Sequence, residues 1–124
     1  MVVMCRGVRG AITVEENSSE AILEATRTLL ETIVAENGMK AEEIASVIFT
    51  ATADLDAVYP AVAARELGWV TVPLLCTQEM RVAGSLPRCI RVLLHWNTER
   101  APAQIRHIYL GEAQRLRPDL VREA

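Results

Sequence analysis

The chain has 124 residues and a formal net charge of −3 at pH 7, and 51% of its residues are hydrophobic. This length and composition predict one folded domain over residues 1–124 and exclude an intrinsically disordered chain. Because the 13 basic residues are scattered and no apolar run approaches the roughly 18 residues of a membrane span, neither nucleic acid nor a membrane is expected as a partner.

The first two elements are expected to be a strand and a long helix. Residues 2–14 are rich in β-branched side chains, which favour a strand. A helix is predicted to begin after a cap at Asn17 or Ser18 and to end at Asn37-Gly38. Apolar side chains recur along one side of this helix and would pack on a sheet: Ile22, Ala25, Leu29, Leu30 and Ile33.

The middle of the chain predicts a strand, a short helix and an extended segment. Residues 46–52 form a short apolar run, typical of a buried strand. Pro60 suits the first turn of a brief helix over residues 61–67. Residues 69–76 are expected to be extended, and Pro73 within them indicates an edge strand or a bulge.

The last part of the chain completes the sheet. Residues 77–87 contain the turn residues of a long loop, residues 89–96 predict a strand, and residues 105–116 are ambiguous between strand and helix. The alternation of elements predicts an α/β or α+β domain with four or five strands and one long helix. Since one helix covers only one face of such a sheet, we expect a homo-oligomer, with a trimeric ring as the most consistent arrangement.

Arg91 is the first candidate for a functional residue. Period-two alternation in its strand places Arg91 on the face opposite Ile90 and Val92. A guanidinium in the middle of a strand is costly to bury unless a counter-charge is present. Arg91 therefore either binds an organic anion or forms a structural ion pair with a carboxylate such as Glu79.

The remaining reactive side chains exclude several kinds of chemistry. The three cysteines and two histidines have no metal-ligand spacing, so no metal is expected, and reduced thiols indicate a cytoplasmic protein. Cys76 has no histidine near it in sequence and is interpreted as a small buried side chain rather than a nucleophile. An arginine-lined site without a nucleophile suits a reaction that needs only positioning and charge stabilisation.

Seven collinear motifs resemble the monofunctional chorismate mutases of the AroH class. The motifs are R-G-V-R-G-A at residues 6–11, A-T-A-D-L-D-A-V-Y-P-A at 51–61, R-E-L at 65–67, C-T-Q-E-M at 76–80, C-I-R-V at 89–92, Q-I-R-H-I-Y-L at 104–110 and L-R-P-D-L at 116–120. The resemblance implies a mixed five-stranded sheet in a pseudo-barrel homotrimer, with active sites in clefts between subunits. It also implies conversion of chorismate to prephenate by a pericyclic [3,3] rearrangement, with no cofactor.

The resemblance further implies roles for individual residues of one subunit. Arg9 and Tyr109 would hold the carboxylate of the enolpyruvyl side chain. Arg91 would place its cation at the ether oxygen, and Glu79 with Cys76 would bind the ring hydroxyl. The expected catalytic residues are therefore Arg91, Glu79 and Cys76.

A neighbouring subunit would complete each site. It would contribute Tyr59, which stands where relatives often have phenylalanine, and Arg65. Leu116 and Arg117, at the start of a mobile C-terminal tail over residues 116–124, would close the mouth of the site. The expected lining also includes Leu74 and Leu75.

Two other functions are compatible with arginine-lined clefts between subunits. An imine-hydrolysing deaminase on a similar trimeric scaffold would release ammonia. A non-catalytic sensor of small carboxylates would bind its ligand tightly without turnover. Fold resemblance alone does not separate these functions, so they have to be distinguished by the geometry and chemistry of the site.

Overall fold

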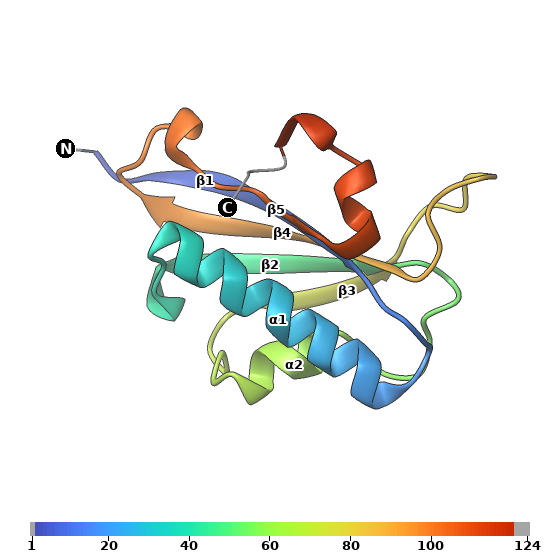
Figure 1. The fold of residues 1–124 in the computed structure, drawn as a ribbon. Coiled ribbons are helices and arrows are strands. Elements are labelled where there is room, and N and C mark those ends of the chain that lie inside the picture. Colours follow the sequence, from blue (N-terminus) through green and yellow to red (C-terminus); the bar gives the residue numbers. More distant parts are fainter. Residues whose placement is uncertain (1, 121–124) are drawn as a thin grey trace.

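A computed structural model describes residues 2–120, so the last four residues of the predicted tail lie outside the described part of the chain. It contains one five-stranded sheet and two α-helices (Figure 1). In chain order, the main elements are β1 (Met4–Thr13), α1 (Ser19–Asn37), β2 (Ile44–Ala51), α2 (Ala61–Glu66), β3 (Leu74–Gln78), β4 (Cys89–Thr98) and β5 (Ile108–Leu110). Short 3-10 turns occupy Ala41–Glu43, Pro102–Gln104, Gly111–Arg115 and Pro118–Leu120.

The sheet is mixed, with the strand order β3-β2-β4-β1-β5. Strand β4 lies at the centre and is antiparallel to both β1 and β2, while β2/β3 and β1/β5 are parallel pairs. The expected mixed five-stranded sheet is therefore confirmed. Its central strand is the one that carries Arg91.

Helix α1 begins and ends as its capping residues predict. The Ser18 side chain accepts a hydrogen bond from the Ala21 N–H at 3.1 Å, and Gly38, with φ of 66°, ends the helix by donating its N–H to the Val34 carbonyl. The helix runs across one face of the sheet, with α2 beside it (Figure 1). Four of the predicted apolar residues are completely buried there: Ile22, Leu29, Leu30 and Ile33.

Close packing between α1 and the sheet requires a glycine at position 10. A Cβ atom on Gly10 would lie 2.7 Å from Ile33 Cδ1 and 3.0 Å from Val92 Cγ1. We predict that Gly10→Ala lowers the free energy of unfolding by about 1 to 3 kcal/mol through overpacking. In the control Gly7→Ala, the new Cβ would lie 3.5 Å from Leu93 Cδ1, so urea unfolding should show little change. Equal unfolding curves for the two variants would contradict the packing argument.

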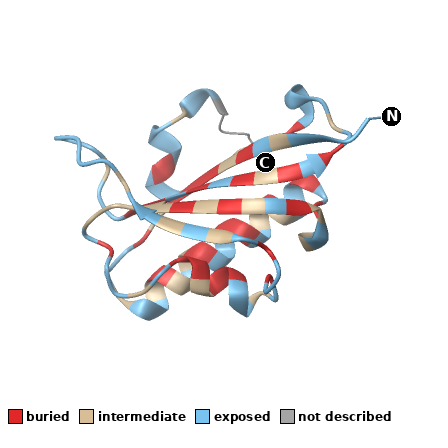
Figure 2. Ribbon diagram, turned by 180° about the vertical axis from the view of Figure 1, so that it is seen from behind, coloured by how far each residue is buried: buried red, intermediate tan, exposed pale blue. Residues whose placement is uncertain are grey.

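The two faces of the sheet differ as the alternation in β4 predicts. Ile90, Val92, Leu94 and Trp96 are buried on the face that α1 covers. On the other face, seen in Figure 2, the strands lie in front and carry alternating buried and more exposed residues. Leu75 is 59% exposed and Leu93 is 36% exposed there. Within residues 2–120, no helix lies across the middle of this second face, which we call the open face.

The largest difference from expectation lies before β3. Residues 69–73 form an irregular loop and β3 begins only at Leu74, so the prediction of an extended segment over residues 69–76 is wrong for residues 69–73. Trp69 is buried against the core in this loop, which shows that tertiary packing rather than strand pairing holds the segment. Pro73 directly precedes an edge strand, as its lack of an N–H indicates, and its carbonyl accepts a hydrogen bond from the Val47 N–H.

The ambiguous C-terminal segment divides at a glycine. Strand β5 covers only Ile108–Leu110, and a 3-10 turn over Gly111–Arg115 follows it. Gly111 has φ of 60°, a conformation that breaks the strand. The other predicted strands end within two residues of the observed boundaries. No helix in residues 2–120 has the length and apolar character needed to cross a membrane.

Candidate active site

Strand register places Arg91 in a row of side chains across the open face. On β4, Arg91 stands directly opposite Thr50 of β2 and opposite Ala11 of β1. Ala11 in turn pairs with Tyr109 of β5. Because directly opposed residues of paired strands point to the same face, this row brings Arg91 and Tyr109 to one surface with only a small alanine between them.

A second row, adjacent to the first, adds Arg9. Arg9 pairs with Leu93, and Leu93 pairs with Ile48 on its other side. The two rows enclose a cavity of about 280 Å³, which we call the open-face cavity. Its lining includes Arg9, Ile48, Thr50, Arg91, Leu93 and Tyr109.

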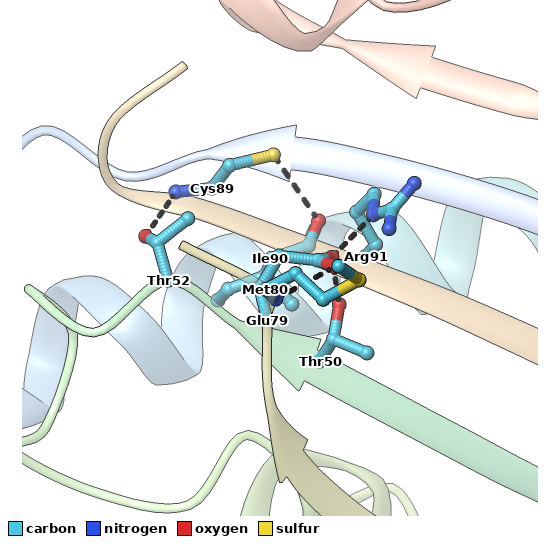
Figure 3. A network of polar contacts seen from close by, with 7 residues as sticks. All are labelled: Thr50, Thr52, Glu79, Met80, Cys89, Ile90 and Arg91. Carbon is cyan, nitrogen blue, oxygen red and sulfur yellow. Dashed lines mark hydrogen bonds and ion pairs between the residues drawn. The ribbon is translucent and has the colours of Figure 1, made fainter. Parts of the chain in front are cut away.

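Arg91, which lines this cavity, forms an ion pair with Glu79 (Figure 3). The Arg91 Nε donates a hydrogen bond to Glu79 Oε2 at 2.5 Å, and the Thr50 hydroxyl donates to the same oxygen at 2.8 Å. The Met80 N–H donates to Glu79 Oε1 at 3.2 Å. The terminal guanidinium nitrogens of Arg91 have no hydrogen-bond partner among the described residues, so the pair leaves donors of Arg91 available.

Both members of this pair keep their charges at neutral pH. The hydrogen bond from Arg91 is the largest cause that lowers the pKa of Glu79 below its usual value, and burial partly opposes it. The hydrogen bond to Glu79 likewise raises the pKa of Arg91. The Glu79 side chain is 20% exposed and that of Arg91 is 52% exposed. The structural ion pair that the sequence left as an alternative is thus present in this single chain.

A network of hydrogen bonds fixes the start of β4. Arg88 has an unusual φ of 46°, and its N–H donates to both carboxylate oxygens of Asp54, at 3.2 and 3.0 Å. The next residue, Cys89, donates its N–H to the Thr52 hydroxyl at 3.0 Å. These contacts join the end of β2 to the start of β4. They compensate for the strained backbone at Arg88, which costs about 1 to 3 kcal/mol. They hold the strand in place two residues before Arg91.

A second group of predicted residues lies along the β3 edge and not in the open-face cavity. These residues line a separate cavity of about 400 Å³, which we call the edge cavity. Tyr59, which is 70% exposed, lies there. The other predicted residues in its lining are Arg65, Leu74, Leu75 and Cys76. One chain therefore does not bring the two groups of predicted residues into one cavity.

Cys76 belongs to this edge group, although the resemblance paired it with Glu79. The two residues line different cavities in one chain, with Cys76 beside Arg65 and Glu79 beside Arg91. Burial raises the pKa of the Cys76 thiol, and the backbone hydrogen bond of Ala61 and the charge of Arg65 oppose this change only partly. The thiol therefore stays protonated at neutral pH, which agrees with the interpretation of Cys76 as a small neutral side chain.

The first residues of the predicted tail lie near the Arg91–Glu79 pair. Leu116 lines a cavity of about 270 Å³ that also has Glu79 and Arg91 in its lining. Arg117 is engaged by Asp119 through two hydrogen bonds of 3.0 and 2.7 Å. Leu116 is thus placed beside the site residues, whereas the Arg117 guanidinium is occupied within its own turn.

Thr50 is a site residue that the sequence interpretation does not identify. It lies within the apolar run of residues 46–52, where a β-branched residue is ordinary. The feature of the sequence that could have identified Thr50 is its hydroxyl, which alternation places on the face of the strand opposite the buried Phe49. Among the described residues, no group of three or more His, Cys, Asp or Glu side chains could hold a metal ion.

Comparisons with known proteins agree on one family. The model of the family "Chorismate mutase type I" matches residues 5–120. A chorismate mutase AroH from Thermus thermophilus is 57% identical over 118 residues, covering 94% of this chain and 97% of that protein. One from Bacillus subtilis (strain 168) is 51% identical over 118 residues, covering 94% and 93%. The solved structure of a chorismate mutase from Clostridium thermocellum has a TM-score of 0.87 and 44% identity, covering 88% of this chain and 97% of that one.

Proposed function

The chain belongs to the type I chorismate mutase family and converts chorismate to prephenate in aromatic amino acid biosynthesis, and we propose that Arg91 is the residue on which this catalysis depends. The observation that supports the proposal is the position of Arg91 on the central strand. Its Nε is held by Glu79, while its terminal nitrogens have no partner among the described residues. Arg91 can therefore offer a fixed positive charge to a ligand on the open face.

The reaction requires charge stabilisation rather than proton transfer. In the [3,3] rearrangement, the C–O bond of the ether breaks and a C–C bond forms in one cyclic shift of electrons, so no proton enters or leaves. When the C–O bond lengthens ahead of C–C formation, negative charge builds on the ether oxygen. A cation already placed at that oxygen stabilises the transition state more than the substrate, and this difference accelerates the reaction. The proposal needs no metal or cofactor.

The other residues of the open-face cavity are suited to holding the substrate. Arg9 lies in the lining of this cavity together with Tyr109. We assign these two residues to the carboxylate of the enolpyruvyl side chain, because a guanidinium and a phenol both donate hydrogen bonds to carboxylates. Glu79, which lines the neighbouring cavity with Arg91, stays ionised and accepts the hydrogen bond of the ring hydroxyl. Holding the flexible substrate in its reactive shape contributes to the rate together with charge stabilisation.

We propose that a neighbouring subunit supplies the edge cavity and that the enzyme is a homotrimer. The open face exposes Leu75 and Leu93, and a second copy would bury them. In this assembly Tyr59, Arg65 and Cys76 of one subunit meet the open face of the next. Leu74 and Leu75 complete that half of the lining. Leu116, which lies beside Glu79 and Arg91, and Arg117 of the tail close the mouth of the whole site.

The enzyme is proposed to work in the cytoplasm. All three cysteines of the chain, Cys5, Cys76 and Cys89, are free thiols. Thiols of this kind are typical of proteins in a reducing compartment.

The pH dependence of kcat provides one test of a mechanism without a general acid or base. Burial raises the pKa of Cys76, and burial raises that of Cys89 to about 11. Arg91 holds the pKa of Glu79 low, so Glu79 loses its charge only as the pH falls below the usual glutamate value of about 4.3. We therefore predict a constant kcat between about pH 6 and 8. A bell-shaped profile centred near neutral pH would show that a proton-transferring group is required.

The proposed function is tested directly by turnover of chorismate. Purified protein should consume chorismate, seen as a loss of its ultraviolet absorbance, and form prephenate without release of ammonia. The mass of the protein in solution should equal that of a trimer. A rate no higher than that of the spontaneous rearrangement would reject the proposal, and a monomeric mass would reject the shared site.

A further inference from the structure

The Glu79 carboxylate accepts a hydrogen bond from Thr50 that the proposed mechanism does not use. Its Oε2 accepts a hydrogen bond from the Thr50 hydroxyl at 2.8 Å as well as one from Arg91 (Figure 3). Its Oε1 accepts the Met80 N–H. Thr50 therefore donates to the oxygen atom that holds the Arg91 guanidinium by its Nε.

Thr50 is the only one of these donors that ties Glu79 to an interior strand of the sheet and is not itself charged. It lies on β2, directly opposite Arg91 in the strand register. Glu79 follows the last residue of the edge strand β3, at the start of the long loop that leads to β4. Only the Glu79 N–H, which donates to the Ala51 carbonyl at 2.9 Å, continues the sheet pairing at this position.

We propose that Thr50 is a positioning residue for the rearrangement: its hydroxyl fixes the Glu79 carboxylate, and the fixed carboxylate keeps the Arg91 guanidinium aimed into the open-face cavity. This inference rests on the proposed role of Arg91. Thr50 acts through Glu79 and Arg91, because its hydrogen bond goes to the carboxylate and not to the reacting atoms. A glutamate side chain at a loop start has several rotamers, and the Thr50 bond selects one of them.

The ion pair with Arg91 alone would not hold the Glu79 side chain in one rotamer. When the substrate engages the terminal nitrogens of Arg91, two other hydrogen bonds hold the carboxylate: one from the Met80 N–H in the loop after β3, and one from the Thr50 hydroxyl on the sheet. Thr50 provides a fixed point on a rigid strand. A hydrogen bond to a charged group is stronger than one between neutral groups, so the contact can hold the carboxylate while its other oxygen accepts the substrate hydroxyl.

The surroundings of Glu79 make the proposal measurable by pH. The charged and titratable groups that face this region are Arg91 and Cys89 of β4, Asp54 of the loop after β2, Tyr109 of β5 and Arg9 of β1. The Arg91 hydrogen bond lowers the pKa of Glu79 most, and the Thr50 hydrogen bond lowers it further. Removing the hydroxyl should therefore raise this pKa, whereas a purely structural role of Thr50 would leave it unchanged.

The variants Thr50→Val and Thr50→Ser separate the hydroxyl from the shape of the side chain. Valine keeps the β-branched shape that suits a strand, so the thermal unfolding midpoint should stay close to that of the wild type. We expect Thr50→Val to lower kcat by roughly tenfold and to move the acid limb of kcat/KM to higher pH. Thr50→Ser should keep both the rate and the acid limb.

The double variant with Glu79→Ala tests whether Thr50 acts through Glu79. In the Glu79→Ala background, Thr50→Val should change kcat by less than about twofold, because the side-chain oxygen that accepts the Thr50 hydrogen bond is gone. The inference would be overturned if the effects of the two single variants on kcat multiply in the double variant. It would also be overturned if Thr50→Val leaves the acid limb unmoved or has wild-type kinetics. If the wild type turns over chorismate and Arg91→Ala does not, these results reject only the role of Thr50. An inactive wild type would instead reject the proposed function.

Discussion

Replacing Arg91 by alanine is expected to lower kcat for chorismate by about 10³-fold, the upper range seen when one preorganised donor to a developing negative charge is removed. The loss should appear in kcat rather than in KM alone, since the charge on the ether oxygen exists mainly in the transition state. Glu79 keeps its Thr50 and Met80 hydrogen bonds without Arg91, so the fold should survive. Steady-state kinetics and thermal unfolding measure the two effects separately.

Lysine at position 91 should fail to restore the rate. A lysine ammonium is a point charge on a flexible stem, whereas arginine can bind Glu79 through Nε and still present its terminal nitrogens. As a matched control, Arg27→Ala removes another arginine from an ion pair, the one with Glu66 on the surface of α1 and α2. This control should keep wild-type kinetics. Near-normal turnover of Arg91→Ala would show that Arg91 has only a structural role.

Mixing two inactive variants should regenerate activity if each site is built from two subunits. Arg91 and Arg65 line different cavities of one chain, and in the proposed shared site each of two neighbouring subunits contributes one of these arginines. In a cyclic trimer that contains both Arg91→Ala and Arg65→Ala subunits, one interface has both arginines. With random assembly from equal amounts, about a quarter of all sites are intact. Activity after co-refolding should therefore rise from near background to about a quarter of the wild-type value.

A second mixture controls for effects of refolding. Arg9 and Arg91 line the same cavity, so every site in a mixture of Arg9→Ala with Arg91→Ala lacks one of them. This mixture should stay inactive. Recovery in this control, or no recovery with Arg65→Ala, would contradict the division of the site between subunits.

The sequence predicts those parts of the fold that depend on local patterns. The two ends of helix α1 could be predicted because the capping residues Ser18 and Gly38 act within one turn of them. The two faces of β4 follow from alternation alone, which placed Arg91 opposite the buried Ile90 and Val92. In these cases the physical cause lies within a few residues of the feature.

Features that depend on contacts distant in sequence could not be predicted in the same way. The register that sets Thr50 opposite Arg91 joins residues on strands far apart in the chain, and no local pattern fixes it. The irregular path of residues 69–73 depends on the burial of Trp69 in the core. The resemblance supplied the candidate residues, but only the structure divides Cys76 from Glu79 into separate cavities.

The central claim is that catalysis needs the positive charge of Arg91 and not merely its hydrogen-bond donors. Replacing Arg91 by citrulline tests this claim most directly, because citrulline keeps nearly the same shape, the Nε–H and one terminal NH2, but has a carbonyl oxygen in place of the other NH2 and carries no charge. We predict that kcat falls by about 10²-fold or more while the thermal unfolding midpoint stays near that of the wild type. A citrulline enzyme with wild-type kcat would contradict the account.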